Sequence, residues 1–327
     1  MLAILVFSRA GRVLAEKISR SYETTIYDTK GAVPPLREQM PTIWESYDRI
    51  LFIGATGIAM RYCAPYLRGK DVDPAVLVMD DQGRFVISLL SGHLGGANAF
   101  AKELAEELGA TPVITTATDG RGIEGLDLYA ASEGLVIEDL HALTPLTGRM
   151  VNGEPLNIYN PYRFRLPRYP RCVEVSSPED GSGPLLAITE KIFSTKREIV
   201  YLRPKILHIG VGARRGASFD ALLSLVVDTF KREGLSLLSV KDIGTISLKK
   251  DEEAILLLAQ TLNCPLNIYE AEELKEFDDR CQGSEFVRQT VGVGSVSATS
   301  ALVQSEALLV EKAVYEGCTL SIGKECP

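Results

Sequence analysis

Residues 89–119 constrain the fold more than any other stretch, because they join an apolar strand, a glycine-rich turn, an amphipathic helix and a second strand. Apolar residues in this block recur at helical spacing and are expected to form the buried stripe of the helix: Leu94, Ala97, Ala101, Leu104 and Leu108. The charged residues between 102 and 107 are expected to face outward. The pattern predicts a helix that begins close to His93. A strand, a helix and a strand in succession are typical of an α/β fold.

The same alternation extends toward the N-terminus. Strands are expected at 4–7, 24–27, 49–55, 75–79, 84–90 and 112–116, and helices near 12–20 and from Ile58 onward. A tight turn at 80–83 should separate two of these strands. Together these elements predict an α/β sandwich with a largely parallel sheet. Ligands of such sheets bind beyond the carboxyl ends of strands, which is where residues 54–61 and 91–98 both fall.

Two further regions follow. Residues 119–203 are rich in proline, and helical periodicity is weak after Leu143, which indicates short strands and turns. Beyond Pro204 the expected elements are a strand and turn at 205–216, a helix capped by Ser218, helices near 251–262 and 270–276, a strand at 265–269, a helix start within 291–303 and a hairpin at 307–324. The predicted fold class is α/β, with two three-layer-type α/β domains of mainly parallel sheets at 1–118 and 204–327, joined by a smaller middle domain with short strands at 119–203.

Composition excludes several classes of function. A net charge of −8 and a pI near 5.2 argue against nucleic-acid binding, which requires clustered Lys and Arg. We find no apolar run long enough to cross a bilayer, and the start of the chain is interpreted as a first strand rather than a signal peptide. Six scattered cysteines favour reduced thiols in the cytoplasm, and three histidines far apart in sequence argue against a structural zinc site.

The turn at 91–96 is a candidate anion site. Gly92, Gly95 and Gly96 remove side chains just before the free N–H groups of the expected helix, where backbone can approach a ligand and the helix dipole favours negative charge. His93 lies in this turn rather than on the apolar stripe. It is either a proton donor or acceptor near neutral pH or a structural capping residue. Ser91 lacks the G-x-S-x-G context of a nucleophile and is interpreted as a helix-entry or ligand-contact residue.

Other motifs leave two interpretations open. Asp119, at the end of the segment 114–119, either caps a turn or is a site carboxylate that faces the same crevice as His93. Gly210 and Gly212 follow a strand, but Gly216 comes one position too late for a dinucleotide motif, so this turn is either tight packing or an anion site, and NAD is not required. The arginine-rich segment 162–171 is either a solvated face or a surface for a polycarboxylate.

Six short segments of the sequence together resemble one known protein family: GATGIAMR, SLLSGHLGGAN, ATPVITTATD, IGVGARRG, GTISLKKDE and VGVGSVSATSAL. With them the chain resembles, from end to end, the cobalt-precorrin-5A hydrolase family of anaerobic cobalamin biosynthesis. Many relatives carry a cysteine where this chain has Ala213, which favours a structural turn there.

The resemblance implies an enzyme that opens the δ-lactone of a cobalt-containing macrocycle and releases acetaldehyde, leaving cobalt-precorrin-5B. Cobalt comes with the substrate, so no separate metal or cofactor is expected. We expect His93 to act as general base, Asp119 to orient it, and helix N–H groups around Gly95 and Gly96 to stabilise the oxyanion. Collapse of the freed alkoxide would expel acetaldehyde, with its electrons accepted by the macrocycle.

The tetrapyrrole bears many carboxylates, so glycine-rich helix starts and arginines of both α/β domains are expected to bind it, in a cleft between the two. The expected substrate contacts are Gly54, Thr56, Gly57, Arg61, Ser91, Gly92, Gly95, Gly96, Asn98, Gly210, Gly212, Arg214, Arg215, Ser295 and Ser297. Two other functions stay open: a non-catalytic carrier or scaffold for pathway intermediates, and a nicotinamide-dependent reductase. No nucleic-acid or membrane partner is expected, and a homodimer is possible.

Overall fold

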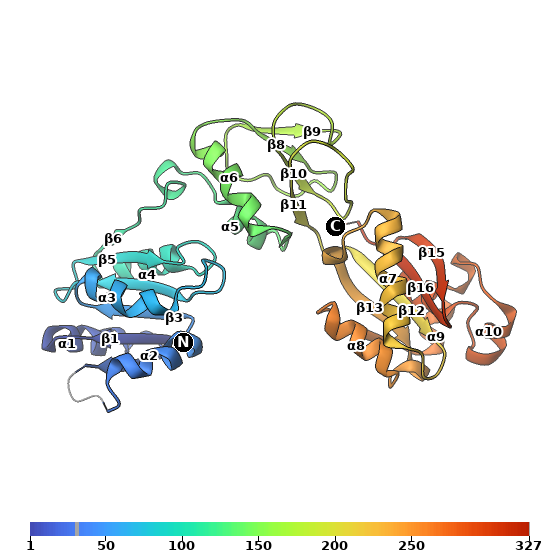
Figure 1. Cartoon of the computed structure of the whole chain (residues 1–327), viewed down its shortest axis with the longest axis horizontal. Coiled ribbons are helices and arrows are strands. Elements are labelled where there is room, and N and C mark those ends of the chain that lie inside the picture. The colour runs from blue at the N-terminus through green and yellow to red at the C-terminus, as the bar shows by residue number, and fades with distance from the viewer. Residues whose placement is uncertain (30–32, 327) are drawn as a thin grey trace. The chain divides into compact units, whose positions relative to one another are not determined.

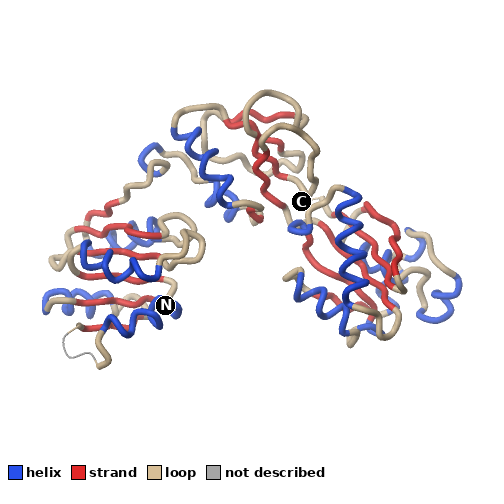
Figure 2. Tube along the Cα trace, in the orientation of Figure 1, coloured by secondary structure: helices blue, strands red, loops and turns tan. Residues whose placement is uncertain are grey.

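The computed structural model describes residues 1–29 and 33–326. The described chain forms two compact units, the first made of residues 1–129 with 167–169 and the second of 130–166 with 170–327. It contains three sheets, one of six strands and two of five. In Figure 2 the strands of each sheet are red and the helices that cover them are blue. The mixed α/β architecture confirms the predicted fold class, while the predicted domain boundaries stay a prediction.

The first sheet has the strand order β2-β1-β3-β4-β5-β6. Its strands are β1 (Leu2–Val6), β2 (Thr24–Asp28), β3 (Arg49–Ile53), β4 (Ala75–Met79), β5 (Phe85–Leu90) and β6 (Thr111–Val113). Neighbouring strands are parallel except β4 and β5, which are antiparallel. The carboxyl ends of β5 and β6 therefore lie at the edge of the sheet where β1 to β4 begin.

Helices cover both faces of this sheet, as Figure 1 shows. They are α1 (Arg9–Ile18), α2 (Leu36–Ser46), α3 (Thr56–Cys63) and α4 (Ala97–Leu108). Because side chains alternate along a strand, Ile4 packs with α1 and α4, while Leu5 packs with α2 and α3. Both faces of β1 are buried, as is usual for a parallel strand between two helical layers.

Several predicted bounds in this unit were wrong. Helix α4 begins at Ala97 and not close to His93, because Gly96 adopts a left-handed conformation with φ +82°. Leu94 consequently lies in the turn and is 37% exposed, so it does not belong to the buried stripe. Strand β6 ends at Val113 rather than Thr116. Helix α2 was not predicted, and it contains Pro41.

The second sheet is built from short strands in the order β7-β11-β10-β8-β9. They are β7 (Val136–Ile137), β8 (Leu156–Tyr159), β9 (Cys172–Val175), β10 (Leu185–Ile188) and β11 (Ile199–Arg203), with helices α5 (Leu126–Ser132) and α6 (Leu140–Val151). Helix α6 corrects the expectation of weak helical structure after Leu143. Its N-cap Asp139 accepts hydrogen bonds from the N–H groups of His141 and Ala142. The helix continues through Pro145 because Leu143, Leu146 and Met150 are buried along it.

The third sheet has the order β14-β13-β12-β16-β15. Its strands are β12 (Leu207–Ala213), β13 (Val240–Ile246), β14 (Leu266–Tyr269), β15 (Ala307–Tyr315) and β16 (Cys318–Lys324). Helices α7 (Phe219–Glu233) and α8 (Glu253–Thr261) pack on the face of Ile209. Helix α11 (Val296–Leu302) packs on the opposite face, against Gly210. The Ser218 cap and the hairpin turn, where Glu316 and Gly317 have positive φ, are confirmed.

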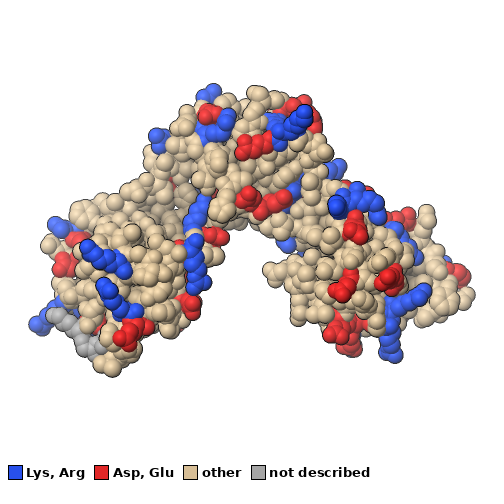
Figure 3. Space-filling model, viewed as in Figure 1, with Lys and Arg blue, Asp and Glu red and all other residues tan. Residues whose placement is uncertain are grey.

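The surface of the protein carries charges of both signs. On the face that Figure 3 presents, acidic and basic side chains lie interspersed over both units. Within the described residues, none of the helices combines the length and the apolar character needed to span a membrane.

Candidate active site

The turn between β5 and α4 holds itself together through its own backbone. The N–H of Gly96 donates to the carbonyl of His93 at 2.8 Å, that of Ala97 to Ser91 at 3.1 Å and that of Asn98 to Gly92 at 2.9 Å. The prediction that the Gly96 N–H stabilises the oxyanion was therefore wrong, because this N–H already donates to the His93 carbonyl. A Cβ on Gly92 would lie 2.7 Å from the Asn98 amide oxygen, and one on Gly95 would lie 2.4 Å from the Ser91 Cβ. Both glycines are thus required by the packing of the turn.

His93 projects from this turn into a cluster of oxygen atoms. Its Nδ1 lies 3.3 Å from the Oδ2 of Asp127, and its Nε2 lies 3.4 Å from the Oδ2 of Asp119. The same Nε2 is 3.1 Å from the Oγ1 of Thr118. Carboxylates therefore face both ring nitrogens, while the imidazole keeps 19% of its surface exposed. The expectation that His93 and Asp119 share one crevice is consistent with this contact.

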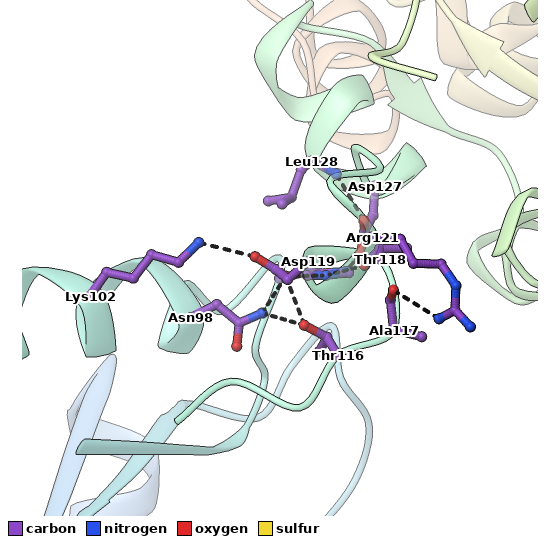
Figure 4. A network of polar contacts seen from close by, with 10 residues as sticks. Asn98, Lys102, Thr116, Ala117, Thr118, Asp119, Arg121, Asp127 and Leu128 are labelled. Atoms are coloured by element: carbon purple, nitrogen blue, oxygen red, sulfur yellow. Dashed lines mark hydrogen bonds and ion pairs between the residues drawn. The ribbon is translucent and has the colours of Figure 1, made fainter. Parts of the chain in front are cut away.

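Asp119 is fixed by three neighbours (Figure 4). Its Oδ2 accepts from the Thr116 hydroxyl at 2.7 Å and from the Asn98 amide at 2.9 Å, and its Oδ1 accepts from the Lys102 ammonium at 3.1 Å. Asn98 and Lys102 both come from α4, so the helix holds the loop that follows β6. Asn98 was expected to contact the substrate, but its amide donates to the Asp119 carboxylate instead. The exposed Lys102 also binds Asp119, a partner that the helical pattern alone could not indicate.

Electrostatics couple the three titratable groups. The hydrogen bond and charge of Asp127, helped by Asp119, raise the pKa of His93 above its ordinary value, although burial opposes this. Burial alone would raise the pKa of Asp127, but the hydrogen bond and charge of His93 lower it. For Asp119 too, hydrogen bonds from Thr116 and Lys102 outweigh burial and lower the pKa. The cluster therefore favours a protonated imidazole between two carboxylates.

Besides Thr118, two further residues of the cluster, Asp127 and Gly125, were missed by sequence reasoning. Asp127 lies in the first turn of α5, and its side chain is 12% exposed. A Cβ on Gly125 would come within 3.1 Å of the His93 ring and 2.6 Å of the Asp127 Oδ1. Gly125 therefore lets the loop before α5 lie against the imidazole. The one signal in the sequence is the Gly-Leu-Asp start of a helix soon after Asp119.

Ser91 does not contact His93. Its hydroxyl donates to the backbone carbonyl of Asp73 at 2.9 Å, and its φ of +55° is one of the few positive values outside glycine. The bond ties the turn to the segment just before β4. Ser91 is accordingly a structural residue of the turn, which favours the first of its two predicted roles, helix entry, over ligand contact.

The predicted residues after β3 lie elsewhere. Gly54, Thr56, Gly57 and Arg61 follow the carboxyl end of β3, which is at the opposite edge of the sheet from the ends of β5 and β6. Arg61 donates to the Gly57 carbonyl of its own helix at 3.2 Å. Residues 54–61 and 91–98 both follow the carboxyl ends of strands, as expected, but they lie at opposite edges of the sheet because β5 is antiparallel to β4.

The third sheet carries a cavity of about 450 Å³ at the carboxyl ends of β12 and β13. Its lining includes Gly212, Arg214 and Ser295, three of the predicted contacts. The walls are mainly apolar, with Val287, Val291, Val296 and Val314 and, from α10 (Glu285–Val291), the exposed Phe286. Lys249 and Lys312 join Arg214, and the lining contains no acidic residue. Such a cavity suits an apolar molecule that carries carboxylates.

Three other predicted contacts do not line this cavity. A Cβ on Gly210 would lie 1.8 Å from the Ser297 carbonyl oxygen, so this glycine lets α11 pack against β12. Ser297 is buried, and its hydroxyl accepts from the Ser321 hydroxyl at 3.0 Å. Arg215 lies near Glu252, whose carboxylate accepts from the Gly216 N–H at 3.1 Å. Gly210 and Ser297 are therefore packing residues, which corrects their assignment to the substrate.

The arginine-rich segment is mostly paired with the protein itself. Arg165 contacts Glu133 at 3.0 Å, Arg168 contacts Glu124 at 3.7 Å, and Arg171 donates to the Gly153 carbonyl. Arg163 lines a separate open cavity of about 610 Å³ beside β8 and β9. Because these arginines have partners within the protein and Arg165 and Arg168 are exposed, the contacts favour a solvated face over a polycarboxylate surface. In the portion of the chain that is described, no three His, Cys, Asp or Glu side chains form a group that could hold a metal ion.

An imidazole between two carboxylates, one from the loop after β6 and one from helix α5, is an arrangement suited to acid–base chemistry on a small molecule. Comparison with known proteins makes this specific. Three family models match in succession: Cobalamin synthesis G N-terminal at 38–119, Cobalamin biosynthesis central region at 124–204 and Cobalamin synthesis G C-terminus at 207–323. The chain belongs to the cobalamin biosynthesis G family.

Curated relatives cover most of the chain. It is 36% identical over 288 residues to the cobalt-precorrin-5A hydrolase of Salmonella typhimurium, covering 85% of this chain and 82% of that protein. It is 33% identical over 291 residues to the cobalt-precorrin-5A hydrolase of Priestia megaterium, covering 84% and 78% respectively. A crystal structure of a cobalamin biosynthesis protein G homolog from Sulfolobus solfataricus is 23% identical, with a TM-score of 0.38 over 99% of this chain and 96% of that one.

Proposed function

We propose that this protein hydrolyses the δ-lactone of cobalt-precorrin-5A and releases acetaldehyde, giving cobalt-precorrin-5B. Two relatives above 30% identity bear the name of that hydrolase. The structural observation that carries the proposal is the His93 ring held between Asp127 and Asp119. Ester hydrolysis needs a base for the attacking oxygen, and an imidazole oriented by a carboxylate is suited to that task.

His93 is the general base in this scheme. The Asp127 carboxylate accepts a hydrogen bond from the Nδ1–H of His93 and so fixes the tautomer in which Nε2 carries the lone pair. Because Asp127 raises the pKa of His93, the neutral imidazole is a stronger base than free histidine, although a smaller fraction is neutral at a given pH. Asp119, which is 24% exposed, lies on the Nε2 side and stabilises the imidazolium that forms.

The bond changes follow from the lactone. Attack on the carbonyl carbon breaks its bond to the ring oxygen and leaves an alkoxide on the extruded carbon. The alkoxide electrons form the carbonyl of acetaldehyde, the bond to the macrocycle breaks, and the macrocycle accepts that electron pair together with a proton. Water is consumed overall. Cobalt belongs to the substrate, and the scheme requires no cofactor.

The cavity of the third sheet, considered within the second unit alone, is our candidate for a site that binds a carboxylate-bearing tetrapyrrole. Its apolar walls match a flat ring, and Arg214, Lys249 and Lys312 match the carboxylate arms. Of these, Lys249 is paired with Glu252 at 3.1 Å. A cytoplasmic location, a homodimer and the lack of nucleic-acid and membrane partners stay predictions.

The test is acetaldehyde production by the purified full chain. Incubation with cobalt-precorrin-5A should release one equivalent of acetaldehyde per substrate, without consumption of NADPH. A protein that binds the lactone and returns it unchanged would instead be a carrier. Consumption of NADPH with no acetaldehyde would indicate the reductase.

A further inference from the structure

We infer that Thr118 is the nucleophile of the lactone opening, so that the reaction passes through an ester between its Oγ1 and the ring A acetate. The inference rests on the proposed hydrolase function and names the oxygen that first attacks. It is carried by three side chains of the first unit that stand in a line: Asp127, His93 and Thr118.

The line has the order carboxylate, imidazole, hydroxyl. Asp127 Oδ2 lies 3.3 Å from Nδ1 of His93, and Nε2 lies 3.1 Å from the Oγ1 of Thr118. A hydroxyl within reach of an imidazole, itself oriented by a carboxylate, is the arrangement by which serine and threonine nucleophiles are activated. The backbone of Thr118 is fixed as well, because its carbonyl accepts from the N–H groups of Arg121 at 3.1 Å and Ile123 at 3.0 Å.

The nearby hydroxyls of Thr116 and Ser91 donate to groups other than the imidazole. Thr116 donates to Asp119 at 2.7 Å, and Ser91 donates to Asp73, so neither faces the imidazole. Thr118 is the hydroxyl that contacts Nε2. Direct attack by water would need a water molecule between Nε2 and the lactone, whereas the Thr118 Oγ1 already lies 3.1 Å from that nitrogen.

Access to this hydroxyl is narrow. Thr118 as a whole is 4% exposed, whereas the side chains of His93 and Asp119 are 19% and 24% exposed. His93 and Asp119 therefore carry more of the exposed surface of the cluster, and Thr118 is the more deeply buried group. Such shielding keeps bulk water away from the attacking oxygen during the first step.

Protons and electrons balance along this route. The Thr118 oxygen bonds to the lactone carbonyl carbon, its proton moves to Nε2 of His93, and the bond to the ring oxygen breaks. The alkoxide then expels acetaldehyde, and the macrocycle takes the electron pair and the proton held by His93. Water next attacks the ester, again deprotonated by His93, and Thr118 leaves with a proton. One water is consumed and the ring A carboxylate is free.

The experiment is a single turnover of the full chain with cobalt-precorrin-5A, quenched in acid at intervals and analysed by intact-protein mass spectrometry. We expect a transient adduct whose mass is that of the product less one water. Peptide mapping should place it on Thr118 rather than on Thr115 or Thr116. Absence of an adduct throughout the first turnover of an active enzyme, or its location on another residue, would overturn the inference.

Variants give an independent readout. Thr118→Val keeps the side-chain shape and should slow acetaldehyde release by about a thousandfold or more, whereas Thr118→Ser should retain activity. Thr115→Val, at an exposed neighbouring position, is the matched control. If folded Thr118→Val, checked by melting and substrate binding, still works within about tenfold of the unmodified enzyme, Thr118 is not the nucleophile. Failure of the unmodified chain to release acetaldehyde would instead refute the hydrolase function.

Discussion

The imidazole of His93 contacts two carboxylates that lie 26 and 34 residues further along the chain, Asp119 in the loop after β6 and Asp127 in the first turn of α5. The sequence could indicate the first, because a histidine after one strand and an aspartate after the next are expected near one another when the strands are neighbours. It could not indicate Asp127 or Thr118. Their contact with the ring depends on how the loop before α5 folds back, and no spacing rule describes that path.

Asp127→Asn should change the pH dependence of the reaction. The rate requires neutral imidazole, so it rises with pH through the pKa of His93. Because Asp127 is the main cause of the raised pKa, its neutralisation should move this acidic limb to lower pH. The plateau rate should also fall by about a hundredfold or more, because the amide no longer fixes the tautomer.

The matched control is Asp81→Asn, in the exposed turn between β4 and β5. Both variants are compared by acetaldehyde release across pH. An acidic limb that does not move in Asp127→Asn would show that Asp127 does not set the protonation of the base.

At the level of elements, the turn at 80–83 sets the direction of β5 and therefore the edge of the sheet at which the predicted site residues after β5 lie. A turn this short can join antiparallel strands only, since parallel strands need a crossover of a dozen or more residues. The predicted turn and strands were thus sufficient to show that β5 runs opposite to β4 and that 54–61 and 91–98 lie at opposite edges, a consequence that the prediction of a largely parallel sheet did not include. The types of most strands and helices could be predicted from periodicity. Helix α6 could not, because Pro145 suggested a break. It forms nevertheless, since the burial of three apolar residues outweighs the loss of one hydrogen bond.

Gly210→Ala tests the packing of helix α11 on strand β12. The added Cβ would lie 1.8 Å from the Ser297 carbonyl oxygen, so helix and strand would have to separate. We expect the free energy of unfolding to fall by about 3 kcal/mol or more, measured by urea denaturation. Gly148→Ala is the control, because nothing lies within 4 Å of its Cβ in helix α6, and it should be neutral or stabilising. Equal stabilities of the two variants would contradict this role of Gly210.

At the level of the whole molecule, a buried charge cluster connects two of the sheets within the second unit. Glu190, fully buried after β10, accepts from the Tyr162 hydroxyl and from the Lys324 ammonium at 3.1 Å, and Lys324 lies at the end of β16. Hydrogen bonds from Tyr162 and Lys324 hold the pKa of Glu190 below its ordinary value although burial opposes this. Sequence patterns gave no sign of this cluster, because its members are far apart in the chain.

Lys324→Met should destabilise the protein by about 3–5 kcal/mol, since Glu190 would keep a buried charge without its cation. Lys241→Met removes a largely exposed partner of Glu325 and should cost under about 1 kcal/mol. Thermal melting followed by circular dichroism compares the two. A similar small loss in both would mean that the Glu190 cluster is not a significant source of stability.

Single-turnover acetaldehyde release by His93→Ala tests the role of His93 as the catalytic base, with His141→Ala as the control at an exposed histidine. We predict that His93→Ala binds cobalt-precorrin-5A with near-normal affinity but releases essentially no acetaldehyde, while His141→Ala behaves as the unmodified protein. Near-normal release by His93→Ala would contradict this role of His93.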